Sequence, residues 1–269
     1  MNKDSLTTVE QIEYYLGKDR LPNVHWKPSI PPMWTIPARS ATYIHQQKDS
    51  IAYRTLNDPT TNTEYKFNNL GYRSNIDYTD DLKNSRVILM LGCSDTWGRF
   101  VDYDKIYPVL VQKKLPDFTV VNMSVPGGSP DQVTRLGVQT ISYLKSAITD
   151  VCMFWPGFSL REFVSKSFTS GTYPLDQDNV PYTDWWDHID WVSNNYNYQK
   201  NKILIESICQ AYNINYHDLI VNREDTVVPF DYIPSGPETV FGELSHNAMA
   251  EYFYKKITKQ PSLFQTTQS

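Results

Sequence analysis

The chain has 269 residues, a formal net charge of −5 at pH 7 and 40% hydrophobic residues, which is typical of a globular protein able to bury a full core. Its acidic balance, and the lack of any run of Lys and Arg longer than two, exclude the basic surface that nucleic-acid-binding proteins need. We therefore expect neither a nucleic acid nor another polyanion as a partner.

The cysteines and the amino terminus indicate the cellular setting. Cys93, Cys152 and Cys209 are far apart, and two of them lie in apolar patterns, so we expect buried thiols of a reducing compartment and neither disulfides nor a zinc site. Residues 1–10 lack the apolar core of a signal peptide, and we find no segment that would cross a membrane. These features predict a cytoplasmic protein. No metal and no organic cofactor is implied, and the oligomeric state is not indicated.

Residues 1–84 show little helical or strand periodicity and are rich in proline and aromatic residues. Side chains such as Trp26 and Trp34 need an apolar surface to cover their rings, so we expect an irregular amino-terminal arm packed on the main body. Near the end of this arm, residues 68–73 have the composition of a turn, and Arg73 is the last of them. Arg73 belongs either to a tight loop or to a functional site.

The body, residues 85–260, alternates strand and helix signals. The run Val87–Leu91 is apolar without alternation, as expected of a strand buried on both faces in the middle of a parallel sheet. Further strands are predicted at 118–122, 151–155 and 214–219, and helices at 104–115, 130–147, 199–212 and 246–258. This order predicts a three-layer α/β/α fold with a central parallel, flavodoxin-like sheet. The polar residues 261–269 are expected to form a flexible tail.

Residues 157–198 interrupt this alternation and are too many for a simple connection. We expect an insertion that lies over the carboxyl ends of the strands. Its tryptophans, among them Trp185 and Trp186, either pack the insertion onto the body or stack on a sugar ring.

Ser94 is the first candidate for a nucleophile. It follows the central strand and Gly92, at the carboxyl end where open α/β sheets bind ligands and carry out chemistry. The alternative is that Gly and Ser only turn the chain and cap the next helix. The neighbouring Cys93 is a weaker candidate, because alternation along the chain would point it away from Ser94.

A serine nucleophile needs a base, usually a histidine held by a third group. Of five histidines, only His246 has a carboxylate three residues earlier, Glu243, in a loop that enters a helix. In the predicted topology this helix begins at the same edge of the sheet as Ser94, so His246 and Glu243 are the candidates for base and orienting acid. The alternative is a histidine that caps the helix or lies on the surface.

Three segments together resemble the motifs of the SGNH (GDSL-type) hydrolases. Residues 92–98, Gly-Cys-Ser-Asp-Thr-Trp-Gly, look like the nucleophile motif, residues 122–128 are similar to the second motif, and Glu243-Leu244-Ser245-His246 resembles the family's Asp-x-x-His. The resemblance implies the fold expected above and a triad of Ser94, His246 and Glu243. It also implies that the backbone N–H groups of Ser94 and Gly127 stabilise the oxyanion.

The chain departs from the family pattern at two places. The third motif, which supplies an oxyanion-hole asparagine, is replaced by Trp155-Pro156-Gly157-Phe158-Ser159-Leu160-Arg161, in which Ser159 or Arg161 would have to act instead. The acid is Glu243 where the family has Asp. Trp97, Trp155 and Arg161 are the candidates for substrate contacts.

The expected activity is hydrolysis of a small acyl ester, such as an acetyl group on a carbohydrate, through an acyl-enzyme on Ser94. Two alternatives remain open at this point. One is a catalytically weak or inactive binding protein on the same fold, and the other is a sugar O-acyltransferase that uses the same residues. The aromatic and polar composition is also similar to that of family members encoded by bacterial viruses.

Overall fold

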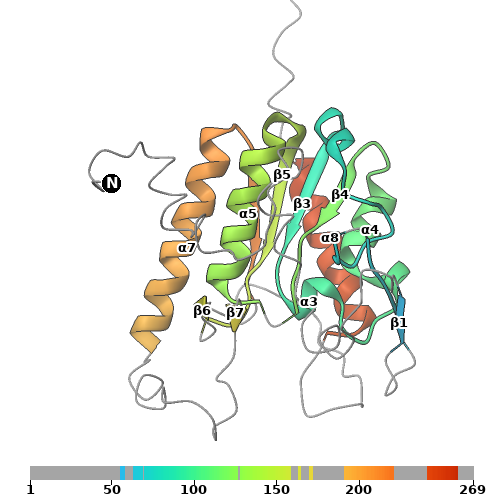
Figure 1. Ribbon diagram of the computed structural model, residues 1–269, viewed down its shortest axis with the longest axis horizontal. Coiled ribbons are helices and arrows are strands. Elements are labelled where there is room, and N and C mark those ends of the chain that lie inside the picture. Colours follow the sequence, from blue (N-terminus) through green and yellow to red (C-terminus); the bar gives the residue numbers. More distant parts are fainter. Residues whose placement is uncertain are drawn as a thin grey trace, which may run out of the picture.

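The computed structural model describes residues 55–57, 63–68, 70–126, 128–158, 163–164, 170–171, 191–220 and 241–259. Within these ranges the chain forms a four-stranded parallel sheet with helices on both sides (Figure 1), as the sequence predicts. The strands, in their order across the sheet, are β4 (Thr119–Asn122), β3 (Val87–Leu91), β5 (Ile148–Phe154) and β8 (Asn215–Leu219). The prediction of a three-layer α/β/α fold is therefore confirmed.

Strand β3 lies between β4 and β5, and all five of its side chains are fully buried. Val87, Leu89 and Leu91 belong to the apolar cluster on one face of the sheet, and Ile88 and Met90 belong to the cluster on the other face. Because both faces are covered, the strand has no polar alternation.

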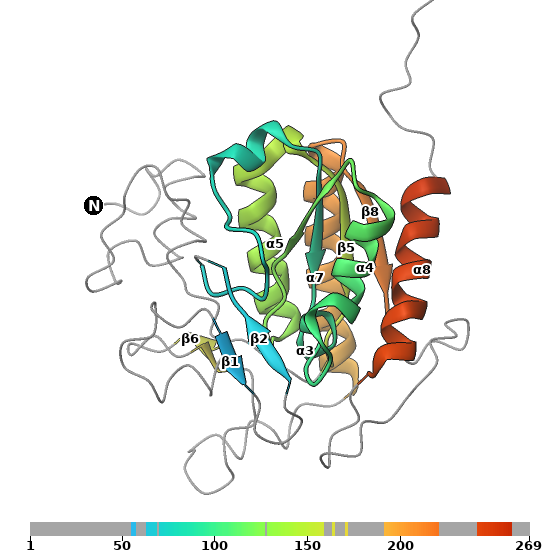
Figure 2. The ribbon, with the colours of Figure 1, turned by 90° about the vertical axis from the view of Figure 1, so that its right-hand side faces the viewer.

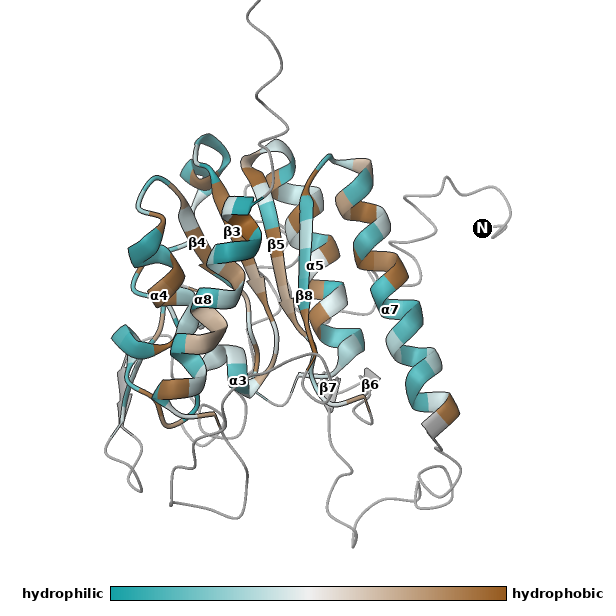
Figure 3. Ribbon diagram, turned by 180° about the vertical axis from the view of Figure 1, so that it is seen from behind, coloured by the Kyte–Doolittle hydropathy of each residue, from teal (hydrophilic) through white to brown (hydrophobic). Residues whose placement is uncertain are grey.

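Each face of the sheet is covered by a pair of helices. Helices α5 (Pro130–Leu144) and α7 (Trp191–Ala211) pack together on one face, and α4 (Tyr107–Lys114) and α8 (Glu243–Lys259) pack together on the other. Figure 2 shows α5 and α8 on opposite sides of the strands. Figure 3 shows hydrophobic colouring along β3 and β5, whereas the helices carry hydrophilic bands.

Shorter elements complete the described ranges. Strands β1 (Thr55–Asn57) and β2 (Glu64–Lys66) form an antiparallel pair, as do β6 (Phe163–Val164) and β7 (Ser170–Gly171). Helix α3 (Ser94–Trp97) follows β3. The 3-10 helices are η5 (Asp80–Asn84), η6 (Tyr103–Lys105) and η7 (Lys145–Ala147). No helix in these ranges is long and apolar enough to cross a membrane.

Two helices begin earlier than their periodicity predicts. Helix α7 begins at Trp191 and not at Gln199. Apolar periodicity does not reveal this start, because the helix buries the polar side chains of Asn197 and Asn201 where apolar ones would be expected. Helix α8 begins at Glu243 and not at His246, and the backbone N–H of His246 already donates to the carbonyl of Gly242 at 3.1 Å.

Several parts of the expected organisation lie outside the described residues. These are residues 1–54 of the expected arm, residues 260–269, which contain the expected tail, and most of the expected insertion, including Trp185 and Trp186.

Candidate active site

Ser94 is the first residue of helix α3, three residues after the last residue of β3, at the carboxyl edge of the sheet (Figure 1). The intervening Gly92 makes this tight turn possible. A Cβ atom at Gly92 would lie 1.9 Å from Oγ1 of Thr96 and 2.9 Å from the backbone oxygen of Phe154, so only glycine fits there. The half-buried Ser94 thus occupies the place that the sequence predicts for it.

The prediction that Cys93 points away from Ser94 is wrong. The Ser94 hydroxyl donates to Sγ of Cys93 at 3.8 Å, and the Cys93 thiol donates to the Asp95 carboxylate at 3.5 Å. Strand alternation does not apply here, because the strand ends at Leu91 and the chain then turns into a helix. Burial, reinforced by the charge of Asp95, raises the pKa of Cys93 to about 12, which keeps it a thiol and disfavours it as a nucleophile.

Burial also raises the pKa of Asp95 to about 6, and the contact with Cys93 partly offsets this rise. Asp95 is the second residue of α3, one position beyond Ser94. The candidate nucleophile therefore has a neighbouring carboxyl group that changes its charge close to neutral pH.

Arg73 fixes the carboxyl end of α3. Its side chain is only 1% exposed and donates to the backbone carbonyls of Trp97 at 3.0 Å, Val101 at 2.5 Å and Gly98. The guanidinium also lies over the rings of Tyr65 and Trp97, at 4.7 and 5.0 Å from their centroids. Of the two alternatives that the sequence leaves open, these contacts place Arg73 in the loop behind Ser94.

His246 lies in the first turn of α8, and its side chain is 0% exposed. The backbone N–H of Tyr107 donates to its Nδ1 at 3.1 Å, and the Tyr107 ring stacks on the imidazole with the centroids 5.9 Å apart. The Tyr107 hydroxyl in turn donates to Oγ1 of Thr96 at 2.9 Å. Tyr107 thus connects the candidate base to the helix that carries Ser94, and α3 lies at the same edge of the sheet as the amino end of α8 (Figures 1 and 2).

Glu243 pairs with a lysine in the structure. Its Oε1 accepts from Nζ of Lys105 at 2.5 Å, and the same ammonium lies 3.2 Å from the Asp102 carboxylate. The hydrogen bond to Glu243, with that to Asp102, raises the pKa of Lys105. Since Nδ1 of His246 accepts a backbone N–H, the neutral imidazole carries its proton on Nε2. In place of the predicted contact between Glu243 and His246, Glu243 thus pairs with Lys105, and Nδ1 of His246 accepts from Tyr107.

The predicted substrate-contacting tryptophans are packed against protein. Trp97 is 5% exposed and lies against Tyr65 and Phe67, with ring centroids 4.5 and 6.3 Å away. Trp155 is 4% exposed, meets Tyr198 edge-on at 5.1 Å, and donates from Nε1 to the Asp218 carboxylate at 3.3 Å. These contacts cover the rings, so their packing favours a core role over substrate contact. Gly127, Ser159 and Arg161 lie outside the described residues.

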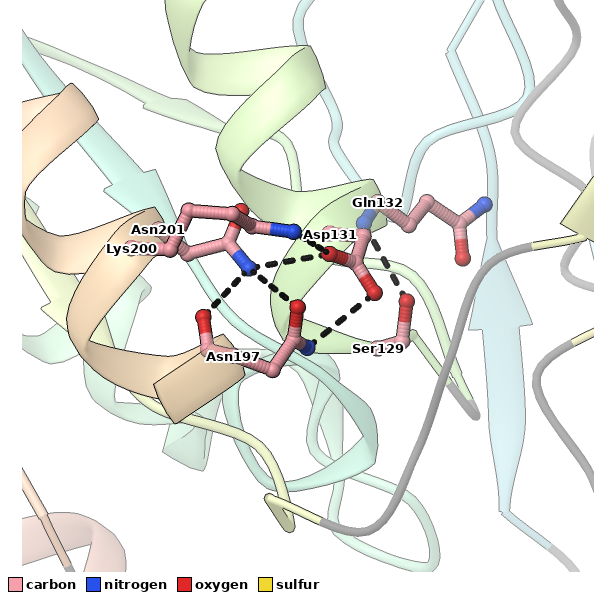
Figure 4. A network of polar contacts seen from close by, with 6 residues as sticks. All are labelled: Ser129, Asp131, Gln132, Asn197, Lys200 and Asn201. Atoms are coloured by element: carbon pink, nitrogen blue, oxygen red, sulfur yellow. Dashed lines mark hydrogen bonds and ion pairs between the residues drawn. The ribbon is translucent and has the colours of Figure 1, made fainter. Parts of the chain in front are cut away.

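The second motif ends at a helix start that the sequence predicts. The Ser129 hydroxyl accepts from the backbone N–H of Gln132 at 3.2 Å, as an N-cap should (Figure 4).

Asp131, in the first turn of α5, accepts from the side chains of Lys200, Asn201 and Asn197 on α7 at 3.1, 2.9 and 3.2 Å (Figure 4). Burial opposes its charge, but Asn201 and Lys200 outweigh it and lower the pKa of Asp131. This network holds α5 and α7 together.

Sequence reasoning missed Tyr107, Thr96 and Lys105. Tyr107 contacts His246 through its backbone N–H, which every residue except proline carries, so no signal in the sequence could single it out. Across the described ranges, no group of three or more His, Cys, Asp or Glu side chains is arranged to hold a metal ion.

No family model and no curated protein matches the chain. Among solved structures, a protein assigned to the G-D-S-L family of lipolytic proteins from Desulfitobacterium hafniense DCB-2 is 13% identical, with a TM-score of 0.35, over 64% of this chain and 99% of the other. A GDSL-like lipase from Bacteroides thetaiotaomicron VPI-5482 is 14% identical, with a TM-score of 0.33, over 66% of this chain and 90% of the other. Likenesses of this size assign neither a family nor an activity.

Proposed function

We propose that the chain is an ester hydrolase of SGNH (GDSL) type with Ser94 as its nucleophile. The observation that carries the proposal is the shared location of two groups. Ser94 opens a helix at the carboxyl edge of the central strand, and His246 lies at the amino end of α8 at the same edge, joined to α3 through Tyr107 and Thr96. This is the edge at which parallel α/β sheets carry their sites.

In the proposed reaction, Oγ of Ser94 bonds to the ester carbonyl carbon while His246 accepts the hydroxyl proton. The backbone N–H of Ser94, in the unpaired first turn of α3, and that of Gly127 stabilise the oxyanion. The alkoxide leaves with the proton from His246. Water, activated by His246, then releases the acid and restores Ser94.

The described hydrogen bonds place one requirement on this scheme. To accept a proton at Nε2, His246 must hold its own proton on Nδ1, where it now accepts from Tyr107. Glu243 would have to exchange Lys105 for His246 to stabilise that form. The proposed catalytic state therefore differs from the described one in the partners of Nδ1 and of Glu243.

The same two contacts favour a second candidate function. If His246 and Glu243 keep Tyr107 and Lys105 as partners, Ser94 has no activated base, and the protein is a binding or structural protein on this scaffold. The resemblance of the motifs, and not the described geometry, is the basis for a small acyl group on a carbohydrate as the substrate. Whether water or a sugar accepts the acyl group is answered by product analysis with a sugar acceptor present.

Labelling with a serine-reactive fluorophosphonate tests the proposal. We expect one adduct, which peptide mass spectrometry maps to Ser94, and hydrolysis of a short-chain aryl ester. Ser94→Ala should abolish both. The matched control, Ser85→Ala, removes a serine hydroxyl just before β3, at the opposite end of that strand, and should leave both unchanged. A folded wild-type protein without an adduct at Ser94, or equal turnover in Ser94→Ala, favours the second candidate.

A further inference from the structure

The loop behind Ser94 is built around a buried cation. Arg73 is among the largest fully buried side chains of the described ranges, and no salt bridge joins it to a carboxylate there. A charged group without a salt bridge is expensive to bury. Burial lowers the pKa of Arg73 to about 10, although the nearby Tyr65, Tyr103 and Asp102 partly offset this fall. Such a group is retained only where many other partners replace water.

The partners of Arg73 belong to one short segment and the strand beside it. Three carbonyl groups accept its protons: that of Trp97, the last residue of α3, that of Gly98, the C-cap, and that of Val101 in the following loop. Carbonyl groups at the end of a helix have no partner within the helix, so they are available to a cation. The rings of Tyr65 and Trp97 cover the guanidinium, as in other cation–π pairs.

Helix α3 needs this support because it has only four residues. An isolated turn of helix is unstable, since ordering it costs more than its few hydrogen bonds return. The loop after it also contains two residues with positive φ, Gly98 at 78° and Phe100 at 66°. The Phe100 backbone N–H donates to the Tyr65 hydroxyl at 3.0 Å, which attaches the loop to β2.

The backbone is shaped to let the guanidinium approach. A Cβ atom on Gly98 would lie 2.2 Å from Cγ2 of Ile106 and 3.1 Å from Nη1 of Arg73. Any larger residue would therefore push against both groups. The left-handed conformation of Gly98 also brings its carbonyl to Nη1 of Arg73.

We propose that Arg73 is a positioning residue for Ser94. It holds the carboxyl end of α3, and through this rigid turn it fixes the direction of the serine hydroxyl three residues earlier. This inference rests on the proposed function in that Ser94 is taken to react. A nucleophile displaced by about 1 Å can lose on the order of 10²-fold in rate, so the arrangement of the turn matters to the reaction even though Arg73 does not touch the substrate.

The test compares Arg73→Lys and Arg73→Ala with Arg86→Met. Lysine keeps the charge but lacks the fork that reaches three carbonyls. The control removes an arginine whose guanidinium lies 4.1 Å from the centroid of the Phe118 ring, at the other end of β3. The readout is the rate constant of fluorophosphonate labelling at Ser94, measured well below the Tm of each variant, with circular dichroism to confirm folding.

We expect about 10- to 100-fold slower labelling in both folded Arg73 variants and no change in Arg86→Met. Guanidinium ion at a non-denaturing concentration should partly restore the rate in Arg73→Ala, whereas the same concentration of ammonium should not. If the Arg73 variants lose Tm but label at the wild-type rate while folded, the role is structural only and the inference is overturned.

Hydrogen exchange separates this inference from the proposed function. We expect Arg73→Lys to accelerate amide exchange in residues 94–101 and to leave β5 and α8 unchanged. If the wild-type protein is not labelled at all, the proposed function fails, and localised exchange would still support the positioning of α3 by Arg73. Exchange that is unchanged, or that rises equally across the sheet, would overturn the positioning role.

Discussion

The backbone N–H of Tyr107 donates to Nδ1 of His246 at 3.1 Å, and the two rings stack. An imidazole nitrogen that accepts a hydrogen bond carries no proton, so the neutral ring is protonated on Nε2. Tyr107 is the first residue of α4, so the N–H group that reaches Nδ1 is one of those that have no carbonyl partner within the helix. In the neutral form of His246 with this contact, Nε2 is therefore the nitrogen that carries the proton.

We predict this tautomer for the free protein near neutral pH. In long-range proton–nitrogen NMR spectra, Nε2 of His246 should resonate as a protonated nitrogen and Nδ1 as an unprotonated one. His246→Gln identifies the signals. Protonation of Nδ1 in the free protein would show that the imidazole is already arranged as a base, contrary to the contact with Tyr107.

Lys105→Met should free Glu243. The ammonium of Lys105 lies 2.5 Å from the Glu243 carboxylate, so its removal leaves that carboxylate able to turn toward His246, which lies in the same turn of α8. We expect a several-fold faster reaction of Ser94 with a fluorophosphonate, with little change in Tm because the ion pair is exposed.

The matched control for this experiment is Lys114→Met. Lys114, the last residue of α4, also makes an exposed ion pair with α8, through Glu251 in the middle of that helix, whereas Lys105 belongs to η6 and pairs with the first residue of α8. The control should leave the labelling rate unchanged. Equal acceleration in both variants would point to a general loosening of α8, and no acceleration in Lys105→Met would mean that Lys105 does not restrain Glu243.

The pattern of the central strand could be predicted from the sequence because burial on two faces leaves a direct mark on residue type. Val87–Leu91 is apolar throughout, and each face of the strand meets its own cluster. The start of helix α7 is harder to predict from the sequence. Its early turns bury Asn197 and Asn201 against Asp131, and in a sequence a buried polar network looks the same as a polar surface.

The contacts of the candidate site were beyond sequence reasoning for a different reason. Arg73 binds carbonyl groups, and His246 accepts a backbone N–H, so the partners in both cases are groups common to nearly every residue. The sequence predicted that Ser94 and His246 would share an edge of the sheet, since this follows from strand and helix order. It did not indicate which hydrogen bonds would hold them.

Asp95 should make stability depend on pH in a defined window. Burial raises its pKa from 3.8 to about 6, so the folded state binds the proton more tightly than the unfolded state. Stability from this group is fully present below pH 3.8 and is lost as the pH rises through about 6. Asp95→Asn should remove this loss and be more stable than wild type at pH 7 by on the order of 1 kcal/mol.

Urea unfolding at several pH values from 4 to 7 measures this difference. Asp117→Asn, at an exposed position beyond α4, is the matched control and should follow the wild-type curve. A difference between Asp95→Asn and wild type that does not change with pH would mean that the carboxyl group of Asp95 titrates normally in the folded protein.

Gly92→Ala should distort the turn that presents Ser94. The new Cβ would lie 1.9 Å from Oγ1 of Thr96, which the Thr96 side chain can relieve only by giving up its present contact with the Tyr107 hydroxyl. It would also lie 2.9 Å from the backbone oxygen of Phe154, which is fixed in β5 and cannot move cheaply. Overpacking of this kind costs about 1 to 3 kcal/mol.

Gly157→Ala is the matched control, because its Cβ would meet no atom within 4 Å, and the effect there should be within about 0.5 kcal/mol. Chemical denaturation gives the stability of each variant, and labelling of Ser94 gives the integrity of the turn. If Gly92→Ala were as stable as Gly157→Ala and labelled at the wild-type rate, the close approach of β3 and β5 at Gly92 would not be what shapes the turn.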